Sequence, residues 1–468
     1  MRIALTGGRV FDATGSSARP ATIRIDGSQI AAIDPPGVAP PEGYTTLDVS
    51  GRTILPGLID MHVHIQLCGE DSLYAFLGAG VTSVRDLGGD PDVLLEMRDA
   101  LATNARIGPR LFVYGPMIDG SPPVFGESAT TSPLTCVCGT PLEAARAADA
   151  LVARGCDGVK VYAGQRPDMV EALVRAVDGR VPVAAHLGRT WASEAIELGV
   201  DTLEHVHATL YQDVVLPADR HTRDGGNGAN PRYYSWLSEG WSRADLDADH
   251  VKRLIDRLVA RRVVLSPTTV LMTGGMATLE ALDEPGQRYR PKTMQMRRRR
   301  RQGADPLSDA AAASGDGRKP RPPREPEDAT RPAGRWPGGP DPEIGRRARA
   351  NELELLRRLH AAGGIITPST DVGAAPLQVP GFALLRELSL LIEAGIPSRD
   401  VLVAATRTAA ETLRAQDRIG TLEPGKLADM IVVDGDPEQD IEALRRLQHV
   451  IKGGAVYDPA EVLAKIET

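Results

Sequence analysis

The chain has 468 residues and a formal net charge of −8, with 42% hydrophobic and 25% charged residues. This length is enough for more than one domain with a large core. The acidic balance argues against nucleic-acid binding, and no run of roughly 18 apolar residues indicates a membrane span. The N-terminus enters a strand pattern without the apolar segment of a signal peptide, so we expect a cytoplasmic protein.

The first 53 residues contain short β-like runs separated by turn residues, and Asp26-Gly27 is typical of a hairpin turn. These runs cover residues 2–5, 21–25, 29–33 and 45–49. A similar β pattern returns after Arg414, in residues 420–434 and from His449 onward. We therefore expect residues 1–53 and 415–468 to form one small β-sandwich domain built from both termini. The four cysteines are too few for a disulfide framework in a chain of this length.

Between residues 54 and 414, apolar runs alternate with amphipathic helical stretches. The expected strands are residues 54–64, 81–87, 111–115, 158–162, 181–186, 202–205, 263–266 and 365–370. The expected helices between them are residues 93–102, 142–154, 191–198, 251–260 and 352–361. Eight such β/α units predict an α/β protein with a TIM-like (β/α)8 barrel, a fold that needs about 250 residues.

The barrel segment is longer than this, so we expect two insertions, at about residues 208–249 and 269–342. The second contains five consecutive arginines from Arg297 and a Pro- and Gly-rich stretch, which we expect to be partly disordered. The arginine run is interpreted as a solvated loop, with a tether for a polyanionic partner as the alternative. Both insertions follow strands at the expected catalytic face, so parts of them are candidates for a lid.

The most informative motif ends the first expected barrel strand with His62 and His64. Alternate side chains of a strand share one face, so these two imidazoles are expected to point together. Such a pair suits a divalent metal. The alternative is two histidines that simply make polar contacts near a turn.

Further candidate ligands lie at the ends of other expected strands, where barrel enzymes build their sites. Lys160 lies in the fourth strand, His186 ends the fifth, His205 ends the sixth and Asp371 follows the eighth. A protonated lysine would repel a divalent cation. A neutral Lys160 that has reacted with CO2 would instead supply a carbamate able to bridge two metals. The alternative is a buried lysine paired with a carboxylate such as Asp371.

Together these motifs resemble those of the amidohydrolase superfamily, closest to the subgroup of imidazolonepropionase-like proteins and metal-dependent, prolidase-type dipeptidases. The matching segments are Leu55-Pro-Gly-Leu-Ile-Asp-Met-His-Val-His, Val159-Lys-Val-Tyr, Ala185-His-Leu, Thr202-Leu-Glu-His, Ser369-Thr-Asp and Thr421-Leu-Glu-Pro-Gly-Lys-Leu-Ala-Asp. They cover both termini and the barrel but neither insertion.

The resemblance implies two divalent metal ions, zinc first, with manganese or cobalt as alternatives. It implies that His62, His64 and Asp371 hold one ion. It implies that His186 and His205 hold the other.

The resemblance further implies that carboxylated Lys160 bridges the ions and that a metal-bridging hydroxide is the nucleophile. Asp371 would be the general base and would pass the proton to the leaving amine. We therefore expect hydrolysis of the C–N amide bond of a peptide-like or N-acyl amino acid substrate.

Three residues are candidates for substrate contacts. Arg189 precedes an expected helix and is suited to a substrate carboxylate, or is a surface arginine. His207 would point inward with His205 if the sixth strand continued; otherwise it is a loop residue. Tyr162, at the end of the fourth strand, is the third candidate.

Three other functions remain open. The first is a hydrolytic deaminase with one metal, which needs no bridging lysine. The second is a hydrolase of natural-product or xenobiotic amides or esters on the same scaffold. The third is a non-catalytic assembly protein, although no expected ligand is missing. We expect a small-molecule or short-peptide substrate, no nucleic acid or membrane partner, and a homo-oligomer.

Overall fold

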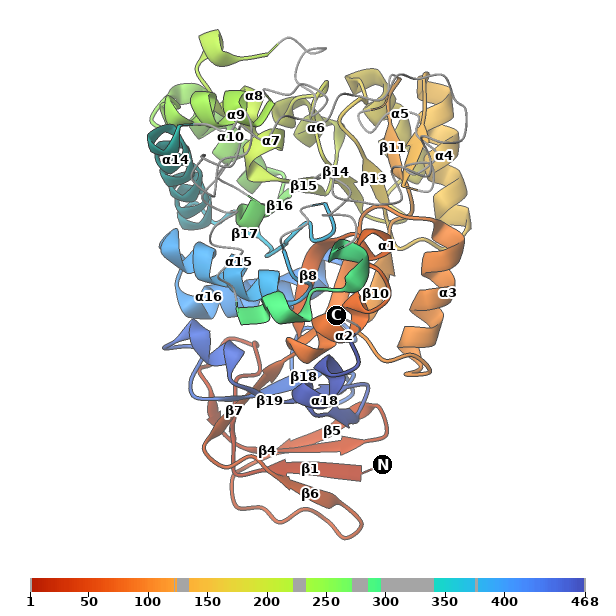
Figure 1. Cartoon of the computed structure of the whole chain (residues 1–468), viewed down its shortest axis with the longest axis vertical. Coiled ribbons are helices and arrows are strands. Elements are labelled where there is room, and N and C mark those ends of the chain that lie inside the picture. Colours follow the sequence, from red (N-terminus) through yellow and green to blue (C-terminus); the bar gives the residue numbers. More distant parts are fainter. Residues whose placement is uncertain are drawn as a thin grey trace, which may run out of the picture.

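The computed structural model describes residues 2–121, 123, 134–221, 233–271, 285–295, 341–374 and 378–466. A barrel of parallel strands surrounded by helices forms one part of the molecule, and two small sheets lie against one end of it (Figure 1). The expected (β/α)8 barrel with an additional β-rich domain is therefore confirmed.

The barrel wall contains a strand at each expected position. These strands are β8 (Leu58–Val63), β9 (Val81–Asp86), β10 (Arg110–Val113), β13 (Val159–Val161), β14 (Val183–Ala185), β15 (Thr202–Glu204), β16 (Val264–Ser266) and β17 (Ile365–Ile366). Two strands that the sequence did not predict, β11 (Met117–Asp119) and β12 (Thr135–Val137), lie between β10 and β13 in the chain. The barrel closes because Val63 forms a parallel bridge with Val372, and Met61 N donates to Pro368 O.

The outer helices include the five expected ones, which are α3 (Pro91–Ala102), α4 (Pro141–Ala153), α6 (Ala192–Leu198), α10 (Asp249–Ala260) and α14 (Pro342–Ala361). They also include helices that the sequence did not predict, among them α5 (Pro167–Val177) and α15 (Phe382–Glu393). Helix α4 begins with a capping box between Thr140 and Glu143. Helix α10 buries Val251, Leu254 and Leu258, the spacing that places apolar residues on one helix face.

The small sheets contain strands from both ends of the chain. One sheet has the order β5 (Gln29–Asp34), β4 (Thr22–Asp26), β1 (Arg2–Thr6) and β6 (Thr45–Asp48). The other has the order β20 (Ala455–Tyr457), β19 (Leu447–Lys452), β18 (Met430–Asp434), β7 (Arg52–Pro56), β2 (Arg9–Val10) and β3 (Arg19–Pro20). Ile23, Ile54 and Val432 belong to one buried apolar cluster, which joins the two sheets.

The expected strand 54–64 is divided between the two parts of the molecule. Strand β7 pairs with β18 in the small sheet, whereas β8 pairs with β9 in the barrel. Gly57 separates them, and a Cβ on Gly57 would lie 2.0 Å from Thr82 Oγ1, so no larger residue fits. The C-terminal helix α18 (Pro459–Leu463) contacts the barrel part of the molecule. Its Leu463 packs with Ala75 of α2 (Ser72–Gly78).

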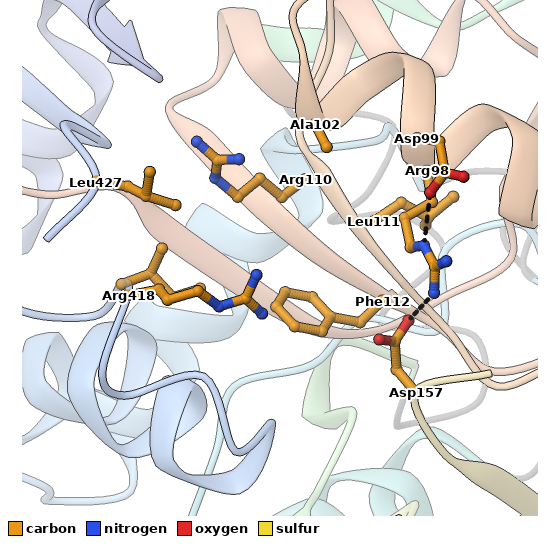
Figure 2. A pocket seen from close by; sticks show the side chains of 10 residues that line it. Arg98, Asp99, Ala102, Arg110, Leu111, Phe112, Asp157, Arg418 and Leu427 are labelled. Carbon is orange, nitrogen blue, oxygen red and sulfur yellow. Dashed lines mark hydrogen bonds and ion pairs between the residues drawn. The ribbon is translucent and has the colours of Figure 1, made fainter. Parts of the chain in front are cut away.

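A cavity of about 270 Å³ lies where the barrel meets the small sheets (Figure 2). Phe112 and Leu427 contribute apolar wall, while Arg98 pairs with Asp157 beside it. Arg110, which also lines this cavity, begins β10, so the cavity lies at the opposite end of the barrel from the carboxyl ends of the strands.

The first expected insertion contains α7 (Val206–Thr209), α8 (Tyr211–Val214) and α9 (Tyr233–Ser242). In the second, the structure describes η2 (Thr269–Leu271), η3 (Pro285–Tyr289) and a few neighbouring residues. The arginine run and the expected disordered stretch lie outside the described residues. Among the helices that are described, none is long and apolar enough to cross a membrane.

Candidate metal centre

Four histidines lie together at the carboxyl ends of the barrel strands. His62 belongs to β8 and His64 follows it, while His186 follows β14 and His205 follows β15. The ring centroids of His62 and His64 are 5.3 Å apart, those of His62 and His205 are 4.7 Å apart, and those of His186 and His205 are 4.4 Å apart. The predicted convergence of these side chains is therefore what the structure shows.

Asp371 lies against this group of histidines. Its Oδ1 is 3.1 Å from His64 Nε2 and 3.4 Å from His62 Nε2. One donor atom each from His62, His205 and Asp371 lies within 4.8 Å of the other two, and all three residues are buried. Donors at this spacing around one point can hold a metal ion.

Hydrogen bonds assign the ring nitrogens that face the cluster. His62 Nδ1 lies 2.9 Å from Glu204 Oε2, and a carboxylate only accepts, so Nδ1 carries the proton. His205 Nδ1 lies 2.8 Å from Thr268 Oγ1, whose own hydrogen is donated to Pro267 O. His205 Nδ1 is therefore also the donor. In both rings the lone pair remains on Nε2, as a metal ligand requires.

Burial holds three of the four histidines neutral, whereas the pKa of His64 is raised because the contact with Asp371 outweighs its burial. Burial, with the nearby Lys160 and other rings, lowers the pKa of His62, His186 and His205 well below the usual range. Within the described part of the chain, His186 Nδ1 has no hydrogen-bond partner. A buried ring nitrogen without a partner fits a ligand that is completed by a metal.

Lys160 lies on β13 and is fully buried. Its Nζ has no hydrogen-bond partner and no ion-pair partner among the described residues, so the alternative of an ion pair with Asp371 is not observed. Burial lowers the pKa of Lys160 to about 8. An amine in this state has an appreciable neutral fraction, which is the form that reacts with CO2. The donor set as a whole therefore fits divalent metal ions.

Beneath the cluster lies a buried ion pair that the sequence analysis missed. Arg85 of β9 is fully buried and its Nη2 donates to Glu204 Oε1 over 2.7 Å. Its Nη1 donates to Thr202 Oγ1 over 3.1 Å. The signal in the sequence is Arg85 directly before Asp86 in an expected buried strand, since charged residues are rarely buried unless they are paired.

The three candidate substrate contacts differ in their positions. The ring of Tyr162 lies 4.8 Å from that of His186, and the ring of His207 lies 5.7 Å from that of His205. Arg189 donates to Ser121 O over 3.1 Å, so its guanidinium is bound to a backbone carbonyl.

The sixth strand does not continue through His207. Strand β15 ends at Glu204, and His205 has φ of 66°, which turns the chain into α7. His207 reaches the cluster from this short helix.

A (β/α)8 barrel that gathers histidines, a lysine and an aspartate at the carboxyl ends of its strands offers the donor atoms that a metal-dependent hydrolase needs. A family model of the amidohydrolase family matches residues 53–220 and 333–456, more than half of the chain. The chain therefore belongs to the amidohydrolase family and is a hydrolase of that family, as the sequence motifs predicted.

Individual relatives agree with this assignment. A segment of 78 residues is 37% identical to imidazolonepropionase of Rubrobacter xylanophilus, but it covers only 15% of this chain and 19% of that protein. The crystal structure of a Xaa-Pro dipeptidase with bound methionine is similar with a TM-score of 0.63 and 22% identity, covering 98% of this chain and all of that one. A putative prolidase from Bifidobacterium longum has a TM-score of 0.66 and 22% identity, covering 99% and 97%. These two structures support the fold.

Proposed function

We propose that this protein hydrolyses the C–N amide bond of a peptide-like or N-acyl amino acid substrate with two divalent metal ions. The observation that carries the proposal concerns Lys160, which is fully buried beside the candidate ligands. Its Nζ has no hydrogen-bond partner among the described residues. A buried amine without a partner destabilises a fold by on the order of 1–3 kcal/mol. Conversion of Lys160 to a metal-bridging carbamate would remove this penalty.

The proposed ligands divide into two groups that share the lysine. His62, His64 and Asp371 would hold one ion, because the Nε2 atoms of both histidines already face Asp371 Oδ1. His186 and His205 would hold the other. Zinc is the first choice for this donor set, with manganese or cobalt as alternatives. Bound ions would supply Lewis acidity toward the substrate carbonyl and lower the pKa of water.

Asp371 is proposed to move the proton that amide hydrolysis requires. It follows β17 with φ of 53°, a conformation that non-glycine residues rarely adopt and that is found at functional sites. Its backbone N–H donates to His62 O over 2.8 Å, which fixes the carboxylate beside the histidines. The nitrogen of the scissile C–N bond departs as an amine only after it gains a proton. One carboxylate that takes a proton from the attacking water and passes it to this nitrogen therefore serves both steps.

The chain's own groups also define the environment of the reaction. His62, His205 and Asp371 are each less than a tenth exposed, so bulk water is largely excluded. Tyr162 and His207 flank the cluster next to His186 and His205. We propose that these two side chains orient the scissile group. Arg189, bound to a backbone carbonyl, is proposed to shape the neighbouring loop and to contact only the outer part of the substrate.

A deaminase with a single ion is the second candidate, and the compact triad of His62, His205 and Asp371 favours it. In that case Lys160 would have no pair of ions to bridge. The number of bound ions therefore distinguishes the two reactions.

The test is elemental analysis of protein purified without chelators and in bicarbonate. We expect about two ions per chain in the wild type, and a lower content in Lys160→Ala. The matched control is Lys452→Ala, because Lys452 is also fully buried but donates to Leu101 O and Asn104 Oδ1, away from the cluster. The same samples are assayed on dipeptides and N-acyl amino acids. One ion per chain that is unaffected by Lys160→Ala would contradict the proposal and bring deaminase substrates forward.

A further inference from the structure

Glu387 is a buried carboxylate without an obvious structural reason. It lies on α15, outside the barrel wall, and is fully buried. Among the described residues no lysine, arginine or histidine pairs with it; burial raises the pKa of its carboxyl group, whereas hydrogen bonds from the backbone of Thr269 and Val270 lower that pKa. A leucine at this position would pack without the penalty of burying a charge. The carboxylate must therefore be explained by what it contacts.

Both oxygens of Glu387 accept hydrogen bonds from one turn. Oε1 accepts from Thr269 N over 3.0 Å, and Oε2 accepts from Val270 N over 2.6 Å. These residues begin the segment that follows β16. Two backbone N–H groups on one carboxylate fix both the position and the orientation of that turn.

The turn is strained at the residue before these contacts. Thr268 has φ of 49°, in the left-handed region that a β-branched residue strongly disfavours. Its backbone N–H donates to Ser369 Oγ over 3.1 Å, and its hydroxyl donates to Pro267 O over 2.8 Å. A strained conformation persists only where the surroundings hold it, and Glu387 supplies two of the bonds that do so.

The strained residue contacts a proposed metal ligand. Thr268 Oγ1 accepts the Nδ1 proton of His205 over 2.8 Å. This contact sets the tautomer of His205 and the direction of Nε2. His205 itself has φ of 66°, so its own backbone is also held out of the favoured regions.

We infer that Glu387 is a positioning residue of the metal centre: it holds the turn at Thr268 and thereby aims His205 Nε2 at the metal. The inference rests on the proposed function, because it requires His205 to bind an ion. Removal of the hydrogen-bond partner of a ligating histidine weakens metal binding by about 10–100-fold. Loss of Glu387 should therefore weaken one of the two ions selectively and leave the other close to wild type.

The experiment measures zinc affinity by competition with a coloured chelator, with thermal unfolding recorded on the same zinc-loaded and metal-free samples. Glu387→Gln places an amide NH2 against a backbone N–H, so one of the two bonds is lost. We expect one of the two zinc affinities to fall by about tenfold or more and the other to stay close to wild type. The matched control is Glu352→Gln, because Glu352 is equally buried on α14 and neither of its oxygens has a hydrogen-bond partner among the described residues. Zinc affinity of this control should equal that of the wild type.

Two further variants keep the test decisive if Glu387→Gln does not fold. Thr268→Val removes the acceptor for His205 without changing size, and should weaken the same ion. Thr268→Ser keeps the hydroxyl that accepts from His205, so its zinc affinity should equal that of the wild type. Zinc affinities unchanged in Glu387→Gln and Thr268→Val, with only the melting temperature lowered, would overturn the inference. Wild-type protein that binds no zinc would instead overturn the proposed function.

Discussion

Glu204 connects a fully buried cation to a proposed metal ligand: its Oε1 accepts from Arg85 Nη2 over 2.7 Å, and its Oε2 accepts from His62 Nδ1 over 2.9 Å. The Thr202 hydroxyl also donates to Oε1, over 2.8 Å. The carboxylate is therefore fixed at both oxygens, and the ring of His62 is fixed with it. Glu204 links β15, where it lies, to β9 and β8 beneath the site.

Replacement of Glu204 by glutamine is expected to weaken zinc binding by about 10–100-fold. The amide must direct its NH2 either at Arg85 or at His62, and both are donors, so one hydrogen bond is lost and His62 can turn. Chelator competition measures the affinity. Glu197→Gln is the control, because Glu197 pairs with Arg261 at the exposed surface. Equal affinities in wild type and Glu204→Gln would show that the histidine is held by other contacts.

Asp371→Asn is expected to lower turnover of an N-acyl amino acid by about 10²–10⁴-fold, because the amide cannot accept and return a proton. Turnover is measured with zinc added until the rate no longer increases. Weaker metal binding by the variant is then not mistaken for the loss of the general base. Metal content is determined on the same samples. A variant that binds both ions and retains wild-type turnover would exclude Asp371 as the proton carrier.

The barrel and the convergence of the candidate ligands were predictable from local sequence patterns. Strand residues of a parallel barrel are buried and apolar, so the polar side chains at their carboxyl ends, such as His62, His186 and Asp371, are conspicuous. The alternation rule placed His62 and His64 on one face, and their rings are 5.3 Å apart. Such inferences need only the chain order and the period of the strand.

The supporting contacts were not predictable, because they join residues that are distant in the chain. Glu387 lies more than a hundred residues from Thr269, and no local pattern relates an outer helix to the turn that it holds. The need for glycine at position 57, between β7 and β8, also depends on a distant residue, since Thr82 leaves no room for a Cβ. The position of His207 in a helix follows from the positive φ of His205, which the sequence does not display.

Removal of Asp429 is expected to destabilise the protein by about 3–5 kcal/mol, because it leaves a mostly buried arginine without its partner. Asp429 accepts from Nε and Nη2 of Arg110 and from Gly453 N at the junction of the barrel and the small sheets. The side chains are only 13% and 3% exposed for Arg110 and Asp429.

Asp429→Ala is compared with Asp26→Ala by denaturant unfolding. Asp26 pairs with Arg2, but about half of each side chain is exposed, so its loss should change stability by about 1 kcal/mol or less. Similar effects of the two substitutions would mean that the junction tolerates the unpaired arginine.

Glu352→Met is expected to stabilise the protein, and more so at higher pH. Burial raises the pKa of Glu352 well above its usual value of 4.5, so the folded chain retains a proton that the unfolded chain releases above that pH. Stability of the wild type therefore falls as pH rises from about 4.5. Methionine is close in size and has no charge, so this loss disappears in the variant.

Unfolding at pH 5 and pH 8 measures the effect. We expect a gain of about 1–3 kcal/mol at pH 8, the scale of relieving one unsatisfied buried polar group, and a smaller gain at pH 5. Glu354→Met is the control, because Glu354 lies on the same helix but pairs with Arg357 and Arg358, which lower its pKa to about 2. A gain at pH 5 equal to that at pH 8 would show that packing, rather than ionisation of Glu352, sets the difference.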